Sequence, residues 1–387
     1  MGPRLVKLED RRAGGRSAWG EAGESRSTSR LSGCVPRTRP EDGRATGAGV
    51  IPALKRGAAR CLHSTGLIGM REARRHGRIG IILMYHRVND DADPFFPSLD
   101  VASFEAQLDH VRSTYRVESL DGLARWLREG PAGPPRVALT IDDGYADTHA
   151  VVLPRLRERG LPATLFLATA PPEEGHLLWL DRLRALVKCT SVPVLELPAR
   201  GLGPWPLDST EDRLWALGRL ASHLKGAGKT EVDGVSGELW RRLEGDAIRW
   251  LPTPLSWTQV RELAAGGVEI GGHTHRHYVL SHLSREEASQ EIARSLDLIR
   301  ERVGRVASSF ACPNGTVSDY TPETLEVLRE LGVEWACTTT SGFATERSAP
   351  LELPRIYTSM DSLPLFACRL AGLTRLGEEE PAGSLAS

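Results

Sequence analysis

The 387-residue sequence lacks several patterns that would decide its class at once. Its six cysteines are dispersed, with no CxxC pair and no framework spacing, which favours free thiols in a reducing compartment. No run of about 18 apolar residues occurs, so we expect no transmembrane helix. No internal repeat is evident, and no pattern predicts an oligomeric state.

Residues 1–30 also lack an apolar stretch long enough for a secretory signal. A cytoplasmic location is therefore favoured. A true start codon that differs from Met1 would instead allow an extracytoplasmic location.

A basic surface is missing from most of the chain. Residues 1–80 contain 17 Lys and Arg against 7 Asp and Glu. Because the whole chain has 49 basic and 50 acidic side chains, the remainder contains 32 and 43. Nucleic-acid binding needs a basic face that displaces counterions from phosphates. The acidic body therefore argues against a nucleic-acid partner.

The ends of the chain carry little periodicity. Residues 1–50 follow neither the helical nor the strand repeat. We expect residues 1–76 to be a basic, mostly disordered extension, or the product of a start assigned too far upstream. A short amphipathic helix around residues 51–75 is expected to pack on the body. Residues 376–387 are expected to be a disordered tail.

From Ile79 onward, strand and helix patterns alternate. The capping-box sequence Ser284–Glu287 marks one helix start. Repeated strand–helix units predict a parallel sheet or barrel whose function lies at the carboxyl ends of the strands. Strands are expected at 79–84, 137–141, 163–168, 335–339 and 353–356, and two further strands are expected to end at Ile270 and at Phe310. Helices are expected at 104–115, 120–127, 152–156, 285–303 and 325–331.

Residues 171–256 interrupt this alternation with two helical patches, at 178–186 and 211–224. Two interpretations stand side by side. The segment is either an insertion that covers the site as a lid or substrate platform, or a set of helices that simply pack on the barrel.

Two motifs carry residues suited to metal-assisted hydrolysis. The pair Asp142-Asp143 ends one predicted strand, and His273 and His277 follow another. One carboxylate and two imidazoles can bind a metal ion while leaving positions open for water and substrate. The second carboxylate is then free to accept a proton from the activated water. A lone Asp pair is more often a turn or helix cap, but the His pair argues against that interpretation.

Together with a third motif, these residues resemble the polysaccharide deacetylases with a NodB-homology domain, carbohydrate esterase family 4. Thr140–Gly144 resembles the family's TFDDG signature, His273-Thr274-x-x-His277 resembles H-[ST]-x-x-H, and Phe310–Gly315 resembles F-x-x-P-x-G. The resemblance spans about residues 79–372. It implies an irregular (β/α)7-type barrel over residues 77–375, with an inserted helical segment at about 171–256.

The resemblance also implies an activity: metal-dependent hydrolysis of N-acetyl groups from an amino-sugar polysaccharide or glycan. By position, Asp143, His273 and His277 would be the metal ligands and Asp142 the general base. This ligand set favours Zn²⁺ and admits Co²⁺, Mn²⁺ or Ni²⁺. The backbone N–H of Asn314 would stabilise the oxyanion.

Other polar residues near these motifs have weaker assignments. Tyr145 and Pro313 are candidate substrate-binding residues, although packing is an equal alternative for Tyr145. His275, His149 and His282 are more typical of structural or surface positions.

Two departures from the family pattern are informative. No histidine follows His282, although many members take their general acid from a C-terminal His. Met84–Val88 instead resembles the circularly permuted branch that includes poly-N-acetylglucosamine deacetylases, which implies His86 as the acid. First and last strands of a closed barrel are neighbours, so this exchange needs little rearrangement. A core histidine at a strand end is the alternative.

The second departure concerns the third motif, where many members carry an Arg that orients the base. Ser308 and Ser309 precede Phe310 instead, and Arg355 on the predicted last strand is expected to take that role.

Two other functions remain open for the whole chain. One is a hydrolase of the same fold that acts on small non-peptide amides. The other is a catalytically inactive carbohydrate-binding protein, although the presence of both aspartates and all three histidines argues against it.

Overall fold

The structure, a computed structural model, describes residues 77–175, 177–243, 248, 252–358 and 362–373. The extension expected at 1–76, with its helix at 51–75, and the tail expected at 376–387 lie outside the described residues. The boundaries proposed for the catalytic domain therefore stay a prediction at both ends.

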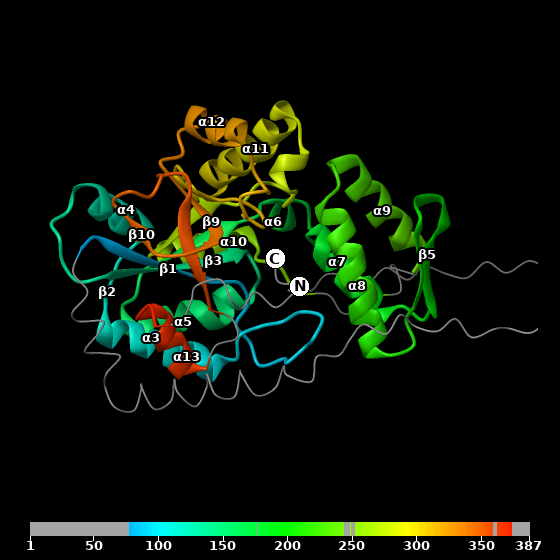
Figure 1. Cartoon of the computed structure of the whole chain (residues 1–387), viewed down its shortest axis with the longest axis horizontal. Helices are drawn as coiled ribbons and strands as arrows, with labels where there is room; N and C mark the ends of the chain where they lie inside the picture. Colours follow the sequence, from blue (N-terminus) through cyan, green and yellow to red (C-terminus); the bar gives the residue numbers. More distant parts are fainter. Residues whose placement is uncertain (1–76, 176, 244–247, 249–251, 359–361, 374–387) are drawn as a thin grey trace, which may run out of the picture. The chain divides into compact units, whose positions relative to one another are not determined.

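Seven parallel strands close into a barrel, which confirms the expected (β/α)7-type fold (Figure 1). Their order around the ring is β1, β11, β9, β8, β7, β4 and β3, and β3 pairs again with β1. The strands are β1 (Ile79–Tyr85), β3 (Arg136–Asp143), β4 (Ala163–Leu167), β7 (Val268–Gly272), β8 (Ser309–Ala311), β9 (Trp335–Ser341) and β11 (Leu353–Tyr357).

Closure of the ring places the first strand between the last strand and β3. Leu83 of β1 pairs with Ile356 of β11 on one side and with Leu139 of β3 on the other. Two short strands extend the sheet outside the ring, β2 (Arg116–Val117) beside β3 and β10 (Ala344–Thr345) antiparallel to β1. The carboxyl ends of β1, β3 and β11 therefore meet at one mouth of the barrel.

Helices connect the strands as the alternation predicts. The helix expected after Ser284 begins with a complete capping box, in which Ser284 accepts from the Glu287 N–H and Glu287 from the Ser284 N–H. The helices around the barrel are α3 (Val101–Thr114), α4 (Leu120–Glu129), η1 (Thr148–Val152), α5 (Leu153–Arg159), α6 (Ala170–Glu174), α10 (Trp257–Ala265), η4 (Leu280–His282), α11 (Arg285–Val303), α12 (Pro322–Glu330) and α13 (Leu363–Leu370).

Four of these helices, α6, α10, α13 and the short η4, were not predicted. Among the described helices, none combines the length and the apolar character needed to cross a bilayer.

The strands are buried on both faces, as parallel strands covered by helices should be. Successive residues belong to different apolar clusters because side chains alternate along a strand. Leu83 and Leu139 pack with residues of helices α3 and α5, whereas Ile82 and Ala138 pack with Phe166 and with helix α4.

The segment that interrupts the barrel has an apolar core of its own. It comprises α7 (Trp179–Cys189), a hairpin of β5 (Val194–Leu197) and β6 (Leu202–Pro206) joined by η2 (Pro198–Arg200), α8 (Thr210–Lys225) and α9 (Lys229–Arg242), drawn in green in Figure 1. Both helical patches are confirmed, while the hairpin and α9 were not predicted. Phe96 and Tyr278, from loops outside the segment, join its core.

The barrel wall supplies a test of the fold. Leu83 is 0 % exposed, so Leu83→Ala should lower the free energy of unfolding by about 2–5 kcal/mol through the cavity it leaves. Val306→Ala is the control, because Val306 is 78 % exposed and should change stability by less than about 0.5 kcal/mol. Urea unfolding measures both. Equal effects of the two substitutions would contradict the barrel packing.

Candidate metal centre and active site

Backbone conformation at the end of β3 turns two adjacent carboxylates toward one site. Neighbouring residues of a strand normally point to opposite faces. The φ angle of Asp143 is +74°, a value rare outside glycine, and it breaks this alternation. Gly144 continues with φ of +103°, and a Cβ there would lie 2.5 Å from Leu167 Cδ1. The Asp-Asp-Gly order thus has a local structural cause.

The two histidines follow β7 on a loop with equally unusual backbone angles. Thr274 and His277 have φ of +60° and +62°. The Thr274 hydroxyl accepts a hydrogen bond from the His277 N–H at 2.9 Å, which explains the hydroxyl residue of this motif. Positive φ at residues other than glycine is costly and tends to occur at functional sites.

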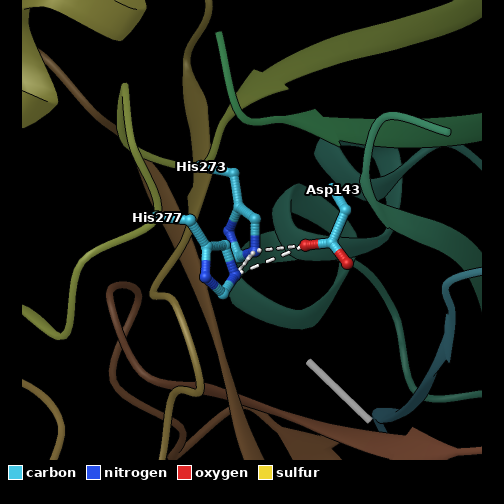
Figure 2. A group of neighbouring side chains, drawn as sticks. All are labelled: Asp143, His273 and His277. Carbon is cyan, nitrogen blue, oxygen red and sulfur yellow. Dashed lines mark hydrogen bonds and ion pairs between the residues drawn. The ribbon is translucent and has the colours of Figure 1, made fainter. Parts of the chain in front are cut away.

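Asp143, His273 and His277 converge in the interior, and all three are buried (Figure 2). Asp143 Oδ1 lies 3.5 Å from His273 Nε2 and 3.3 Å from His277 Nε2. The two Nε2 atoms are 3.1 Å apart. No other group of three possible metal-binding side chains is found among the described residues.

The protonation of His273 shows that this cluster fits a cation. Its Nδ1 lies 2.7 Å from the carbonyl oxygen of Ala311, and because a carbonyl only accepts, Nδ1 carries the proton. In the neutral ring, Nε2 then offers a lone pair to the cluster. Asp143 Oδ1 is buried and accepts no well-directed hydrogen bond. Two imidazoles and one carboxylate form a donor set suited to Zn²⁺ and its neighbours.

Charges in the cluster shift its pKa values in opposite directions. Burial opposes the ionised form of Asp143, but the imidazoles of His273 and His277, whose Nε2 atoms lie 3.5 and 3.3 Å from Asp143 Oδ1, hold the pKa of Asp143 well below its usual range. Burial also opposes the charged form of His273, but the Asp143 and Asp142 carboxylates raise the pKa of this ring. A proton therefore competes with a cation for His273 Nε2.

Asp142 is held by a buried ion pair with Arg355. The guanidinium donates to Oδ1 and to Oδ2 of Asp142, each at 2.8 Å, and both residues are buried. Arg355 also donates to the Thr338 carbonyl at 3.0 Å and to the Thr140 hydroxyl at 3.2 Å. Burial works against ionisation, but the Arg355 charge lowers the pKa of Asp142 below its ordinary value. Asp142 is ionised and fixed in orientation.

His86 follows β1 at the same mouth of the barrel. Burial lowers the pKa of His86, although the Asp143 and Asp142 charges act in the raising direction. The ring is therefore neutral near pH 7, and its Nδ1 is buried without a hydrogen-bond partner. Its ring centroid lies 5.9 Å from that of Tyr357, at the end of β11.

The third motif forms a tight turn after β8. The Gly315 N–H donates to the Pro313 carbonyl at 2.6 Å, and Asn314 has φ of +56°. The Thr339 hydroxyl donates a hydrogen bond to the Asn314 carbonyl oxygen at 2.6 Å. Within the described part of the chain, the Asn314 N–H has no hydrogen-bond partner, and no hydrogen bond joins Asn314 to the three candidate ligands.

The structure places the remaining sequence candidates outside the metal cluster. The Tyr145 hydroxyl donates to Asp181 of α7, at 2.9 and 3.1 Å from its two oxygens. His275 uses both ring nitrogens elsewhere, with Nδ1 2.9 Å from the Thr169 hydroxyl and Nε2 3.0 Å from Glu174. A role for Tyr145 in substrate binding stays a prediction.

The sequence matches the family described as polysaccharide deacetylase over residues 129–200 and 209–336. The chain belongs to the polysaccharide deacetylase family. It is thus a hydrolytic N-deacetylase that acts on polysaccharide. The matched ranges include Asp142 and all three residues of the metal cluster, but neither His86 nor Arg355.

Solved structures share the fold of this deacetylase at low sequence identity. The Streptococcus pyogenes deacetylase PplD, in complex with acetate, is 19 % identical, with a TM-score of 0.52 over 76 % of this chain and 98 % of that one. IcaB from Ammonifex degensii is 18 % identical, with a TM-score of 0.51 over the same shares. A search of curated proteins found no match.

Several contacts of the deacetylase site carried no sequence signal. The Ala311 carbonyl acts through its backbone, which no residue pattern reveals. Trp179 and Asp181 lie on helix α7 and belong to none of the three motifs of the sequence. Thr140 belongs to a recognised motif, but its bond to Arg355 depends on the closure of the barrel.

Removal of a single ligand should abolish metal binding. We expect the wild-type deacetylase to bind one divalent ion per chain, and we expect Asp143→Asn and His273→Ala to bind none at the same concentration. His275→Gln is the matched control, because it changes the intervening histidine of the same motif and should keep the ion. Elemental analysis after dialysis measures all four proteins. Retention of metal by His273→Ala would contradict the ligand assignment.

The ion pair of Asp142 predicts a pH-dependent stability. A carboxyl group with a lowered pKa contributes stability above its unfolded value of about 4 and loses it as the pH falls through the folded value. Arg355→Met leaves Asp142 buried and unpaired, so it should cost about 3–5 kcal/mol at pH 7. This cost should shrink toward pH 4, where Asp142 of the variant is protonated.

Urea unfolding at both pH values tests this expectation. Arg125→Met is the control, because Arg125 is largely exposed beside Asp121 and its loss should destabilise the protein far less than that of Arg355 at either pH. A cost of Arg355→Met that is the same at pH 7 and pH 4 would contradict the interaction.

Proposed function

We propose that this deacetylase removes N-acetyl groups from amino-sugar residues of a polysaccharide or glycan, with a divalent metal ion held by Asp143, His273 and His277. The observation that carries the proposal is the convergence of these three buried groups next to the ion-paired Asp142. A bound ion, for which Zn²⁺ is favoured, would supply an electrophile for the acetyl carbonyl and acidify water at neutral pH.

Asp142 is assigned as the general base. Its carboxylate is ionised, and Arg355 uses one acceptor site on each oxygen, which leaves further lone pairs for a water proton. The bidentate guanidinium also prevents rotation of the carboxylate, so the proton acceptor stays aimed at the site. The chain thus separates the two adjacent carboxylates into one ligand and one base.

Asn314 and His86 are assigned to the two groups that change charge after water attacks: the acetyl oxygen, which becomes negative, and the departing amine, which needs a proton. The free N–H of Asn314 donates to the acetyl oxygen as it becomes negative. His86 is neutral in the resting protein, because burial lowers its pKa, so during the reaction it receives the proton that Asp142 has taken from water, when the negative charge on the acetyl oxygen favours the imidazolium form. It then protonates the departing amine, and the products are the free amine and acetate.

The place of His86 supports the permuted arrangement within the family. Strand β1 lies between β11 and β3, so a histidine at its end reaches the same mouth as one carried by the last strand. PplD, which shares this fold, is described as a deacetylase with acetate bound, and acetate is the product expected here.

Acetate release tests the proposal. Acetylated chito-oligomers and cell-wall glycan should release acetate with the wild type, and removal of the metal by a chelator should stop it. Asp142→Asn should lower kcat by about 10²–10⁴-fold, the usual contribution of a general base. Metal content and Tm of the variant confirm that the site is otherwise intact. An Asp142→Asn protein with undiminished metal-dependent activity would contradict the mechanism.

A substrate with a good leaving group isolates the acid. His86→Gln should lose about 10²-fold or more on an N-acetyl amide, because the amine cannot depart without a proton. The same variant should lose far less on 4-nitrophenyl acetate, whose phenolate departs unprotonated. Asp142→Asn serves as the comparison, since it should impair both reactions. Equal losses of His86→Gln on amide and ester would contradict the acid role.

A further inference from the structure

Helix α7 of the inserted segment touches both loops that carry the candidate metal ligands. On the first loop, the Trp179 indole N–H donates to the carbonyl oxygen of His277 at 3.0 Å. Both residues are buried. The bond holds the backbone of His277, which, unlike His273, has a φ angle in the left-handed region, +62°. A residue in that region needs support from its surroundings to stay there.

On the second loop, α7 holds the chain that follows Asp143. Asp181, two residues after Trp179, accepts a hydrogen bond from the Tyr145 hydroxyl. Arg184, one turn farther on, donates to Asp181 at 2.9 Å and neutralises it in the interior. Tyr145 follows Asp143 by two residues, so its anchorage fixes the exit of the chain from the second strained ligand.

The end of the inserted segment reinforces the same loop through its backbone. The Ala146 N–H donates to the Thr253 carbonyl and the Leu255 N–H to the Gly144 carbonyl, each at 2.9 Å. Tyr145 and Pro254 form an antiparallel bridge between these bonds. The loop after Asp143 is therefore hydrogen-bonded both to α7, near the start of the inserted segment, and to residues 253–255, at the end of the segment.

Helix α9 adds a contact on the histidine loop. The hydroxyl of Tyr278, directly after His277, donates to Asp233 at 2.5 Å. Lys229 pairs with Asp233 at 2.6 Å and lies 5.4 Å from the Tyr278 ring centroid. These contacts reach the backbone of His277 and the residues that follow Asp143 and His277, and none of them uses a ligating atom.

We propose that the inserted segment positions the metal ligands, with Trp179 fixing His277 and Asp181 fixing the loop of Asp143 through Tyr145. The segment acts on the affinity of the metal site rather than only covering a substrate. This inference rests on the proposed function in one respect, that Asp143, His273 and His277 bind a divalent ion. Contacts behind metal ligands typically contribute 10–100-fold to affinity.

Zinc affinity of the folded apoprotein tests the inference. Trp179→Phe keeps the aromatic ring and removes only the N–H, and it should raise the Kd for Zn²⁺ by about 10–100-fold in competition with a chromogenic chelator. Trp205→Phe is the matched control, because Trp205 lies in the same segment, packed edge-on against Trp215, and should change the Kd by less than twofold. The Tm of each apoprotein is measured alongside.

The outcomes separate positioning from general stability. A lower apoprotein Tm with an unchanged Kd would overturn the inference, because Trp179 would then serve folding only. An unchanged Kd and Tm would also overturn it. If Trp179→Phe does not fold, Tyr145→Phe tests the other loop, and it too should weaken Zn²⁺ binding by at least tenfold.

The same titration is independent of acetate release. A wild type that binds Zn²⁺ and loses affinity in Trp179→Phe, yet releases no acetate from any acetylated glycan, would support the positioning role and contradict the proposed function. Normal acetate release with equal Zn²⁺ affinity in wild type and Trp179→Phe would do the reverse.

Discussion

Two adjacent buried carboxylates at the mouth of a closed barrel impose the constraint on which this site depends. Their mutual repulsion and their removal from water would drive both toward the protonated form unless positive charge is supplied. Arg355 supplies it to Asp142 through two hydrogen bonds of 2.8 Å. Asp143 faces two imidazole nitrogens instead, which creates the demand that a divalent ion would meet.

Closure of the barrel determines which segments of the chain lie next to the two carboxylates. Because β1 pairs with β11 and with β3, the chain after Tyr85, the side chain of Arg355 and the Asp pair come to one mouth, although they are far apart in the sequence. The strained angle at Asp143 then separates the roles of the two carboxylates. Closure of the barrel and the φ angle of Asp143 thus connect the fold to the arrangement of the two carboxylates.

Much of this arrangement is predictable from the sequence, because it depends on local patterns. Alternating apolar strands and amphipathic helices indicate the barrel, and the capping box at Ser284 fixes the start of α11 closely. Asp143, His273 and His277 lie together in a group that could hold a metal ion. The barrel and the helix start need only residues that are near one another in the chain, whereas the cluster joins two motifs 130 residues apart and was expected from their resemblance to the family signatures.

The parts that escaped prediction depend on long-range geometry. The β5–β6 hairpin alternates only weakly and contains Gly and Pro, so its strand pairing is set by the core of the inserted segment. The role of Trp179 follows from a contact with a backbone carbonyl 98 residues away, which leaves no trace in residue type. The positive φ of Asp143 is not evident from the sequence either, because only a small fraction of non-glycine residues adopt such an angle.

Anomalous diffraction at the zinc absorption edge from crystals of the zinc-loaded chain tests the central claim most directly. The account predicts one strong peak per chain at about 2.0–2.2 Å from Asp143, His273 and His277, with Asp142 outside the ligand sphere and still paired to Arg355. A peak at another site, or zinc coordinated by Asp142 in place of Asp143, would contradict it.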